Sequence, residues 1–217
     1  MTGKPHVVIT THLAAIVLLA LLAGASARAQ TQSWYLDPNH SAAQFAVRHM
    51  GISTVRGAFT KIGGVVVDSP DLGKASVNVT IDASSIDTRV EMRDKDLRSD
   101  HFFDVAKYPT ITFQSKKVES AGAGKLKITG DLTMHGVTKE AVLDVDGPTP
   151  PVKDPRGSLR RGVSATTTIS RADYGMNYDA PMVGDQIAIQ LDVELVDKAP
   201  GPPRSGPGGP PPPPPAN

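Results

Sequence analysis

The sequence has 217 residues with 23 lysines and arginines, 22 aspartates and glutamates, a formal net charge of +1 and no cysteine. The near-neutral charge gives no electrostatic argument for a nucleic acid partner. Without cysteine the chain forms no disulfides, so an apolar core must stabilise it. The length fits one folded domain flanked by two short terminal segments.

Residues 1–29 have the composition of an export signal. Lys4 precedes an apolar run over residues 13–23, and alanines at Ala-x-Ala spacing follow the run up to Ala29. The run is shorter than the roughly 20 apolar residues that span a bilayer, so we predict a signal cleaved after Ala29. An uncleaved anchor is the alternative interpretation. Cleavage removes Lys4 and Arg28 and changes the formal charge from +1 to −1.

Apolar and polar residues alternate in repeated short segments across residues 30–198, which we predict to be the folded domain. Ala43, Phe45 and Val47 share one face of such a segment, and residues 187–195 alternate in the same way. Alternation is typical of strands with one apolar and one solvated face, and it favours an antiparallel sheet. We therefore predict an all-β fold of about eight or nine strands. The pattern leaves a packed sandwich and a closed barrel with an apolar cavity open.

The segment from Arg93 to Asp104 interrupts this pattern. It is rich in charge and contains no glycine or proline, so we predict a short helical insert. In one interpretation the insert is a structural cover for the barrel. In the other it is a lid, whose Leu97 and Phe102 face the ligand and whose Arg93 or Arg98 contacts an anionic or quinone head group, because a guanidinium binds oxygen atoms in a fork.

Residues 199–217 consist largely of proline and glycine and end in six consecutive prolines before Ala216. Such a segment cannot form a core. We predict a disordered tail, and the alternative is a spacer or a docking peptide for a protein partner.

Several blocks of the sequence have a specific order and spacing: Trp34 to His49, Gly51 to Phe59, Ile81 to Thr88, Arg93 to Asp104, Tyr108 to Phe113, Gly130 to Lys139, Ser170 to Met176 and Val183 to Asp185. Together they resemble the YceI-like family of exported, lipocalin-like proteins described as polyisoprenoid-binding. The resemblance extends from about Ser33 to Asp197. One departure lies in the insert, where the family pattern Arg-Asp-x-His-Leu has Asp96 in place of the histidine.

The resemblance implies a closed antiparallel lipocalin-like β-barrel of about eight strands with a short helical insert. It further implies a periplasmic location, no catalysis, no cofactor, and an isoprenoid or quinone-like lipid, a long-chain amphiphile, bound inside the barrel. It is also compatible with a homodimer. The alternative function is a filled barrel that acts as a protein-interaction or stress-response module without a lipid, and a weaker alternative is an enzyme of isoprenoid chemistry.

Candidate site residues follow from the inward face of the strands and from the insert. None of the histidines left after cleavage has zinc-motif spacing, and no Gly-x-Ser-x-Gly occurs, so we predict neither a metal site nor catalytic residues. His49 shares the parity of Phe45 and Val47, which suggests a polar contact to a head group. The candidate ligand-binding residues are Phe45, Val47, His49, Phe59, Val79, Ile81, Arg93, Leu97, Phe102, Ile111, Phe113, Ile128, Met134, Ile169, Met176, Ile189 and Leu191.

Overall fold

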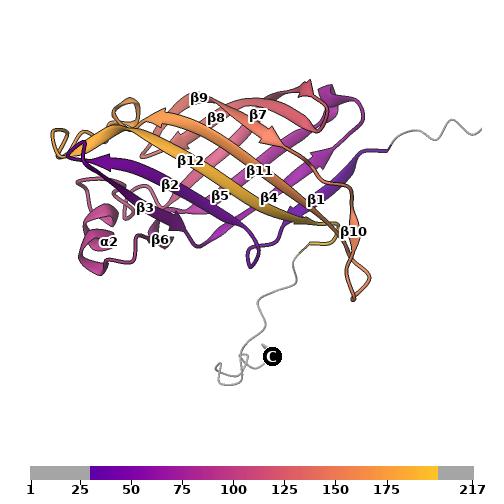
Figure 1. The fold of residues 1–217 in the computed structure, drawn as a ribbon, viewed down its shortest axis with the longest axis horizontal. Helices are drawn as coiled ribbons and strands as arrows, with labels where there is room; N and C mark the ends of the chain where they lie inside the picture. Colours follow the sequence, from indigo (N-terminus) through magenta and orange to yellow (C-terminus); the bar gives the residue numbers. More distant parts are fainter. Residues whose placement is uncertain (1–29, 200–217) are drawn as a thin grey trace, which may run out of the picture. The chain divides into compact units, whose positions relative to one another are not determined.

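The computed structural model describes residues 30–199 (Figure 1). The predicted export signal, residues 1–29, lies outside the described residues, as do residues 200–217 of the predicted tail. Within the described part of the chain, no helix is both long and apolar enough to cross a membrane.

Eight antiparallel strands form a closed ring in the order β1, β4, β5, β7, β8, β9, β11 and β12, and pairing between β11 and β12 closes it. Each of these strands therefore pairs with a neighbour on both sides. The prediction of a closed antiparallel barrel of about eight strands is therefore confirmed. The ring strands are β1 (Gln32–Leu36), β4 (Ile62–Asp68), β5 (Ser76–Asp82), β7 (Thr110–Gly122), β8 (Lys125–Met134), β9 (Val137–Asp146), β11 (Leu159–Ser170) and β12 (Val183–Val196).

Four further strands extend the sheet beyond the ring. The strand β2 pairs with β12 over residues 183–192, whereas β1 pairs with the last part of β12, at Leu195 and Val196. Consequently β1 and β2 follow one another along the same edge of β12 (Figure 1). The additional strands are β2 (Ala42–His49), β3 (Ser53–Phe59), β6 (Ile86–Asp87) and β10 (Val152–Lys153), and three 3-10 turns lie at η1 (Leu72–Lys74), η2 (Ala83–Ser85) and η3 (Ala172–Tyr174).

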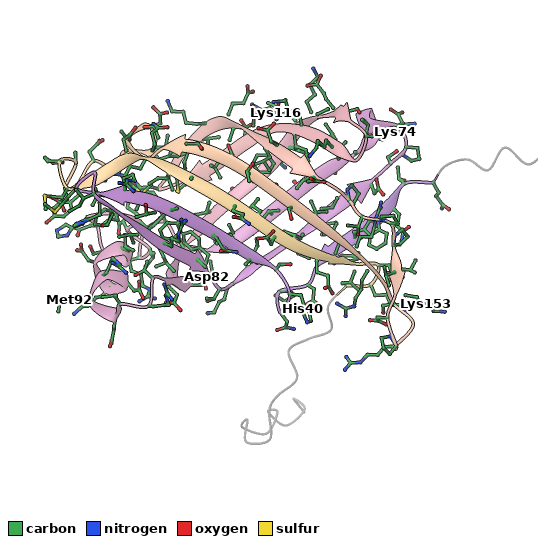
Figure 2. All side chains as sticks on the ribbon, in the orientation of Figure 1. His40, Lys74, Asp82, Met92, Lys116 and Lys153 are labelled. Carbon is green, nitrogen blue, oxygen red and sulfur yellow. The ribbon has the colours of Figure 1, made fainter. Side chains whose placement is uncertain are left out.

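The alternation in the sequence becomes an inner and an outer face of the barrel. In β9, Ala141, Leu143 and Val145 are buried, whereas the intervening residues are exposed. Charged side chains such as Lys116 and Lys153 project outward from the sheet (Figure 2). The apolar interior is thus built from every second residue of each strand.

The helical insert is shorter than predicted. The helix α2 runs over Glu91–Arg98, and the remainder of the predicted segment, up to Asp104, consists of turns. Ser99 ends the helix because it leaves the helical conformation, with φ −74° and ψ 177°, and its side chain donates to the carbonyl of Asp96 at 2.6 Å. The next turn is fixed by the backbone N–H of Phe103, which donates to the Leu97 carbonyl at 3.0 Å.

Candidate ligand-binding cavity

The barrel contains a cavity of about 260 Å³, lined almost entirely by apolar side chains from the ring strands, from β2 and β3, and from the insert. Its volume lies just below the range for ligand pockets, roughly 300–1,000 Å³. Fifteen of the seventeen candidate residues line it. They are Phe45, Val47, Phe59, Val79, Ile81, Leu97, Phe102, Ile111, Phe113, Ile128, Met134, Ile169, Met176, Ile189 and Leu191.

The cavity extends along the barrel. Arg161 in β11 and Arg171, one residue past the end of that strand, both line it and share the inward parity of Ala165. Ten residues of strand at about 3.3 Å each separate the two arginines by roughly 33 Å. Because its lining includes residues at both ends of β11, the cavity is elongated, which suits a linear chain better than a compact ring system.

Aromatic side chains join the insert to the strands at one end of this cavity. The rings of Phe45 and Phe59 lie 6.0 Å apart, and Phe103 meets Phe59 edge to face at 5.5 Å. The Phe45 ring lies directly over Gly57 on the neighbouring strand, where an added Cβ would be 2.5 Å from the ring. The insert therefore contributes apolar surface to the interior, and a residue without a side chain makes room for it.

The other two candidates, His49 and Arg93, do not line the cavity. His49 is half-buried at the end of β2, opposite Val183, where the pairing between β2 and β12 becomes irregular. The inward parity of Phe45 and Val47 therefore does not carry His49 into the cavity. A contact of either residue with a ligand head group stays a prediction.

Arg93 and Asp94 attach the insert to the preceding loop through Thr88, which is buried. Asp94, only 7% exposed, accepts hydrogen bonds from the backbone N–H and the hydroxyl of Thr88 at 2.8 and 2.5 Å. The guanidinium of Arg93 donates to the Thr88 hydroxyl oxygen at 2.7 Å and to its carbonyl at 3.0 Å. These contacts give both residues a structural role and leave the lid interpretation of Arg93 without support from its position.

Arg98 has a similar role at the other end of α2. It donates to the Ser84 carbonyl at 2.7 Å and to the Ile86 carbonyl at 2.6 Å. Both arginines named for head-group binding thus hold the helix against the chain segment that precedes it.

The outer surface of this end is closed by contacts between the insert and the connection from β11 to β12. His101 donates from Nδ1 to the Asp96 carboxylate at 2.8 Å, and its ring stacks on Tyr178 with centroids 4.0 Å apart. Phe102, which lines the cavity, meets Tyr178 edge to face at 5.6 Å. Asp96, which departs from the family pattern, therefore positions a ring that packs against the opposite connection.

The sequence prediction missed the two arginines that line the cavity. Arg161 forms an ion pair with Asp68 and donates to the Thr149 carbonyl at 2.8 Å. Arg171 is 5% exposed, and within the described part of the chain its side chain donates only to backbone carbonyls. The strand parity that identified Ile169 also assigns both arginines to the inner face, and this was the signal that could have found them.

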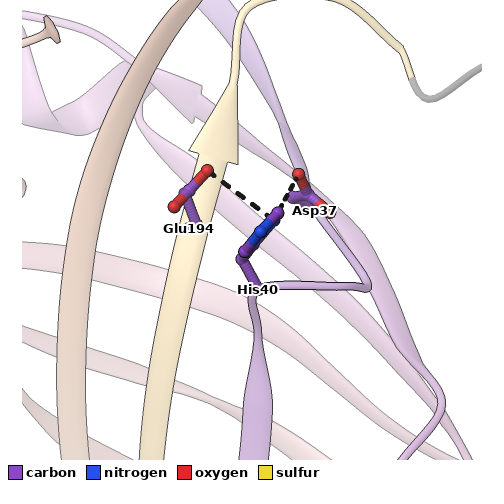
Figure 3. Close-up of side chains that lie close together, drawn as sticks. All are labelled: Asp37, His40 and Glu194. Carbon is purple, nitrogen blue, oxygen red and sulfur yellow. Dashed lines mark hydrogen bonds and ion pairs between the residues drawn. The ribbon is translucent and has the colours of Figure 1, made fainter. Parts of the chain in front are cut away.

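A polar cluster at the surface has the ligand types of a metal site. Asp37, His40 and Glu194 place their ligand atoms within 4.8 Å of one another, and His40 lies between the two carboxylates (Figure 3). Arg160 donates from Nη1 to both carboxylates and from Nε to Asp154 at 2.9 Å. Because a guanidinium already supplies the positive charge, we interpret the cluster as an ion-pair network that fixes the turn after β1.

Comparisons with known proteins agree with this architecture. Residues 34–195 match the YceI-like domain family. A UPF0312 protein of Ectopseudomonas mendocina is 35% identical over 187 residues, which cover 84% of this chain and 95% of the relative. A YceI protein of Campylobacter jejuni is 33% identical and superposes with a TM-score of 0.62 over 70% of this chain and 90% of the other. A polyisoprenoid-binding domain from Saccharophagus degradans, 18% identical, has a TM-score of 0.56 over 78% and 100% of the two chains.

The family match covers nearly the whole described domain, and relatives above 30% identity align over most of their length. Together with the closed eight-stranded barrel and the short helix, this shows that the chain belongs to the YceI-like domain family.

Proposed function

We propose that the protein binds one long-chain isoprenoid or quinone-like lipid inside the barrel and carries or stores it in the periplasm without changing it chemically. The observation that carries the proposal is the apolar cavity, which extends along the inside of the barrel and is lined by side chains of the strands and the insert. A solved domain of the same fold is described as polyisoprenoid-binding, which supports the same ligand class.

Energetics favour an occupant over a void. Side chains that line a void lose packing contacts, so an apolar cavity without contents is destabilising. Water gains little there because apolar walls offer it few hydrogen-bond partners. An apolar chain restores the missing contacts and is itself removed from water.

The cavity argues against the alternative of a completely filled barrel. A filled barrel would place larger side chains at central inward positions, but Ala141 and Ala165 occupy such positions and both line the space. A homodimer, a protein partner for residues 199–217 and cleavage after Ala29 remain predictions.

The central test is ligand recovery from the mature protein. Native mass spectrometry followed by organic extraction should reveal a co-purifying lipid, or stoichiometric uptake of an added polyprenol that is recovered unchanged. A ligand-free mass together with no uptake of added polyprenol would overturn the proposal. Recovery of a chemically altered lipid would contradict the non-catalytic part alone.

A matched pair of substitutions ties uptake to the cavity. Ala165→Phe introduces a ring into the middle of the cavity, and we expect it to lower polyprenol uptake at least tenfold. Thr166→Phe places the same ring on the outer face of the same strand, where Thr166 is exposed, and should leave uptake unchanged. Equal uptake by both variants would show that the lipid binds elsewhere, and thermal melts would confirm that both are folded.

A further inference from the structure

Arg171 is a buried cation at the insert end of the cavity, and its partners do not neutralise it. It is 5% exposed and lines the cavity, with its guanidinium carbon 6.0 Å from the Phe102 ring. Nε donates to the Gly184 carbonyl at 3.1 Å and Nη2 to the Val183 carbonyl at 2.9 Å. Nη1 donates at 2.8 Å to two more carbonyls, those of Met176 and Tyr178.

Among the residues that the structure describes, these four bonds leave one guanidinium N–H of Arg171 without an acceptor. A guanidinium carries five N–H groups, and the remaining one is on Nη2. Among residues 30–199, no carboxylate lies within ion-pair distance of Arg171. Burial lowers the pKa of the guanidinium, while the more distant Asp185 and Asp179 act in the opposite direction. The group stays charged and has the capacity for one more oxygen acceptor.

The other end of the cavity has a different chemistry. There, Arg161 is neutralised by its ion pair with Asp68, and its guanidinium lies 5.3 Å from the Trp34 ring. The indole N–H of Trp34 is buried and has no partner among the described residues, so it is the competing position for a ligand oxygen. It is a single neutral donor, whereas hydrogen bonds from a charged donor are roughly twice as strong.

We propose that Arg171 fixes the direction of the bound lipid. An oxygen of the ligand's head group, from a hydroxyl, carbonyl or phosphate, accepts the free N–H of Arg171 at the insert end, and the apolar chain extends toward Trp34. The proposal rests on the proposed function, because it assigns an orientation to the same ligand. It makes Arg171 a residue that selects lipids carrying a terminal oxygen over pure hydrocarbons of equal length.

Trp34 is the only tryptophan in the chain, so its fluorescence reports on one end of the cavity. Bromine quenches tryptophan at contact range. We would load the wild-type protein with hexaprenol brominated either at the double bond nearest the hydroxyl or at the double bond farthest from it. The far dibromide should quench Trp34 strongly and the near dibromide should leave it almost unchanged.

The outcomes separate the two proposals. Stronger quenching by the near dibromide, equal quenching by both, or binding without quenching by either would overturn the orientation while leaving lipid binding intact. Failure of both probes to bind, measured by native mass spectrometry, would instead overturn the proposed function.

A substitution tests the role of the charge itself. Arg171→Gln should weaken hexaprenol binding about tenfold or more, since a hydrogen bond to a charged group is lost. Squalene, an isoprenoid hydrocarbon with the same number of carbons and no oxygen, should bind the variant and the wild type equally. Equal weakening of both ligands would assign Arg171 a purely structural role and overturn the proposal. If the variant does not fold, the wild-type protein still gives the answer through its preference for hexaprenol over squalene, whose absence would overturn the proposal.

Discussion

Asp37 offers a quantitative test of the ion-pair network at the turn after β1. The side chain is nearly buried and accepts hydrogen bonds from Arg160 at 2.7 Å, from His40 at 3.0 Å and from the backbone N–H of Asn39 at 2.9 Å. Burial alone raises the pKa of Asp37, but these hydrogen bonds outweigh it and lower the pKa from 3.8 to about 2.

The size and sign of the effect on stability follow from this pKa. At 1.36 kcal/mol per pKa unit, the difference between 3.8 and about 2 corresponds to about 2 kcal/mol. Because the pKa is lower in the folded state, ionised Asp37 stabilises the fold fully above about pH 4, and the contribution is lost as the pH falls toward 2. Asp37→Asn removes the charge and keeps the shape, so it should lower the free energy of unfolding by about 2 kcal/mol at pH 7.

Urea unfolding of the wild type and Asp37→Asn at several pH values between 7 and 2 measures this difference. We expect it to be constant from pH 7 to about 5 and to shrink below about 0.5 kcal/mol at pH 2. Asp144→Asn is the control, because Asp144 forms a surface ion pair with Lys127 and its removal should change stability by less than about 1 kcal/mol. A pH-independent gap between wild type and Asp37→Asn would refute the argument that the charge of Asp37 stabilises the fold.

Two further predictions concern packing around the insert. Gly57→Ala should destabilise the fold by about 1–3 kcal/mol in urea unfolding, because its Cβ would lie 2.5 Å from the Phe45 ring. The control is Gly63→Ala, whose Cβ would have nothing within 4 Å, so this variant should be neutral or slightly stabilising. Equal effects of the two substitutions would contradict the close packing of Phe45 on Gly57. Asp94→Asn weakens the hydrogen bonds to Thr88 and should lower the free energy of unfolding by about 1.5–3 kcal/mol. Amide hydrogen exchange should accelerate more in residues 91–98 than in the barrel strands. Uniform acceleration across the protein would contradict a local role of Asp94.

The inner face of the barrel could be predicted because it depends on a local rule. Residues two apart in a strand face the same side, so Phe45 and Val47 identify one inner face and Ile189 and Leu191 identify another without knowledge of the pairing. The rule fails where the strand loses its regular partner. His49 lies at such a point, and its parity does not bring it into the cavity.

The limits of the insert could not be predicted because they depend on contacts with distant residues. The sequence from Arg93 to Asp104 has no helix-breaking residue, yet the helix ends at Arg98, where the chain turns back so that Phe103 can pack on Phe59. Asp104 then adopts a left-handed conformation with φ 44°, which composition does not indicate. Arg171 was overlooked for a different reason. A charged residue at an inward position contradicts the binary pattern, and the pattern alone does not say that backbone carbonyls surround it.

Two segments have different roles at the insert end of the cavity. The charged groups of α2 are committed to holding it in place, through Asp94 and Arg98, while Leu97 and Phe102 form part of the cavity wall. The insert thus shapes the end of the cavity but offers little polar chemistry to a ligand. That chemistry comes from Arg171, in the connection from β11 to β12 that packs against the insert. Changes in the insert, such as the aspartate at position 96, should therefore alter how firmly this end closes, whereas the choice of head group should depend on Arg171.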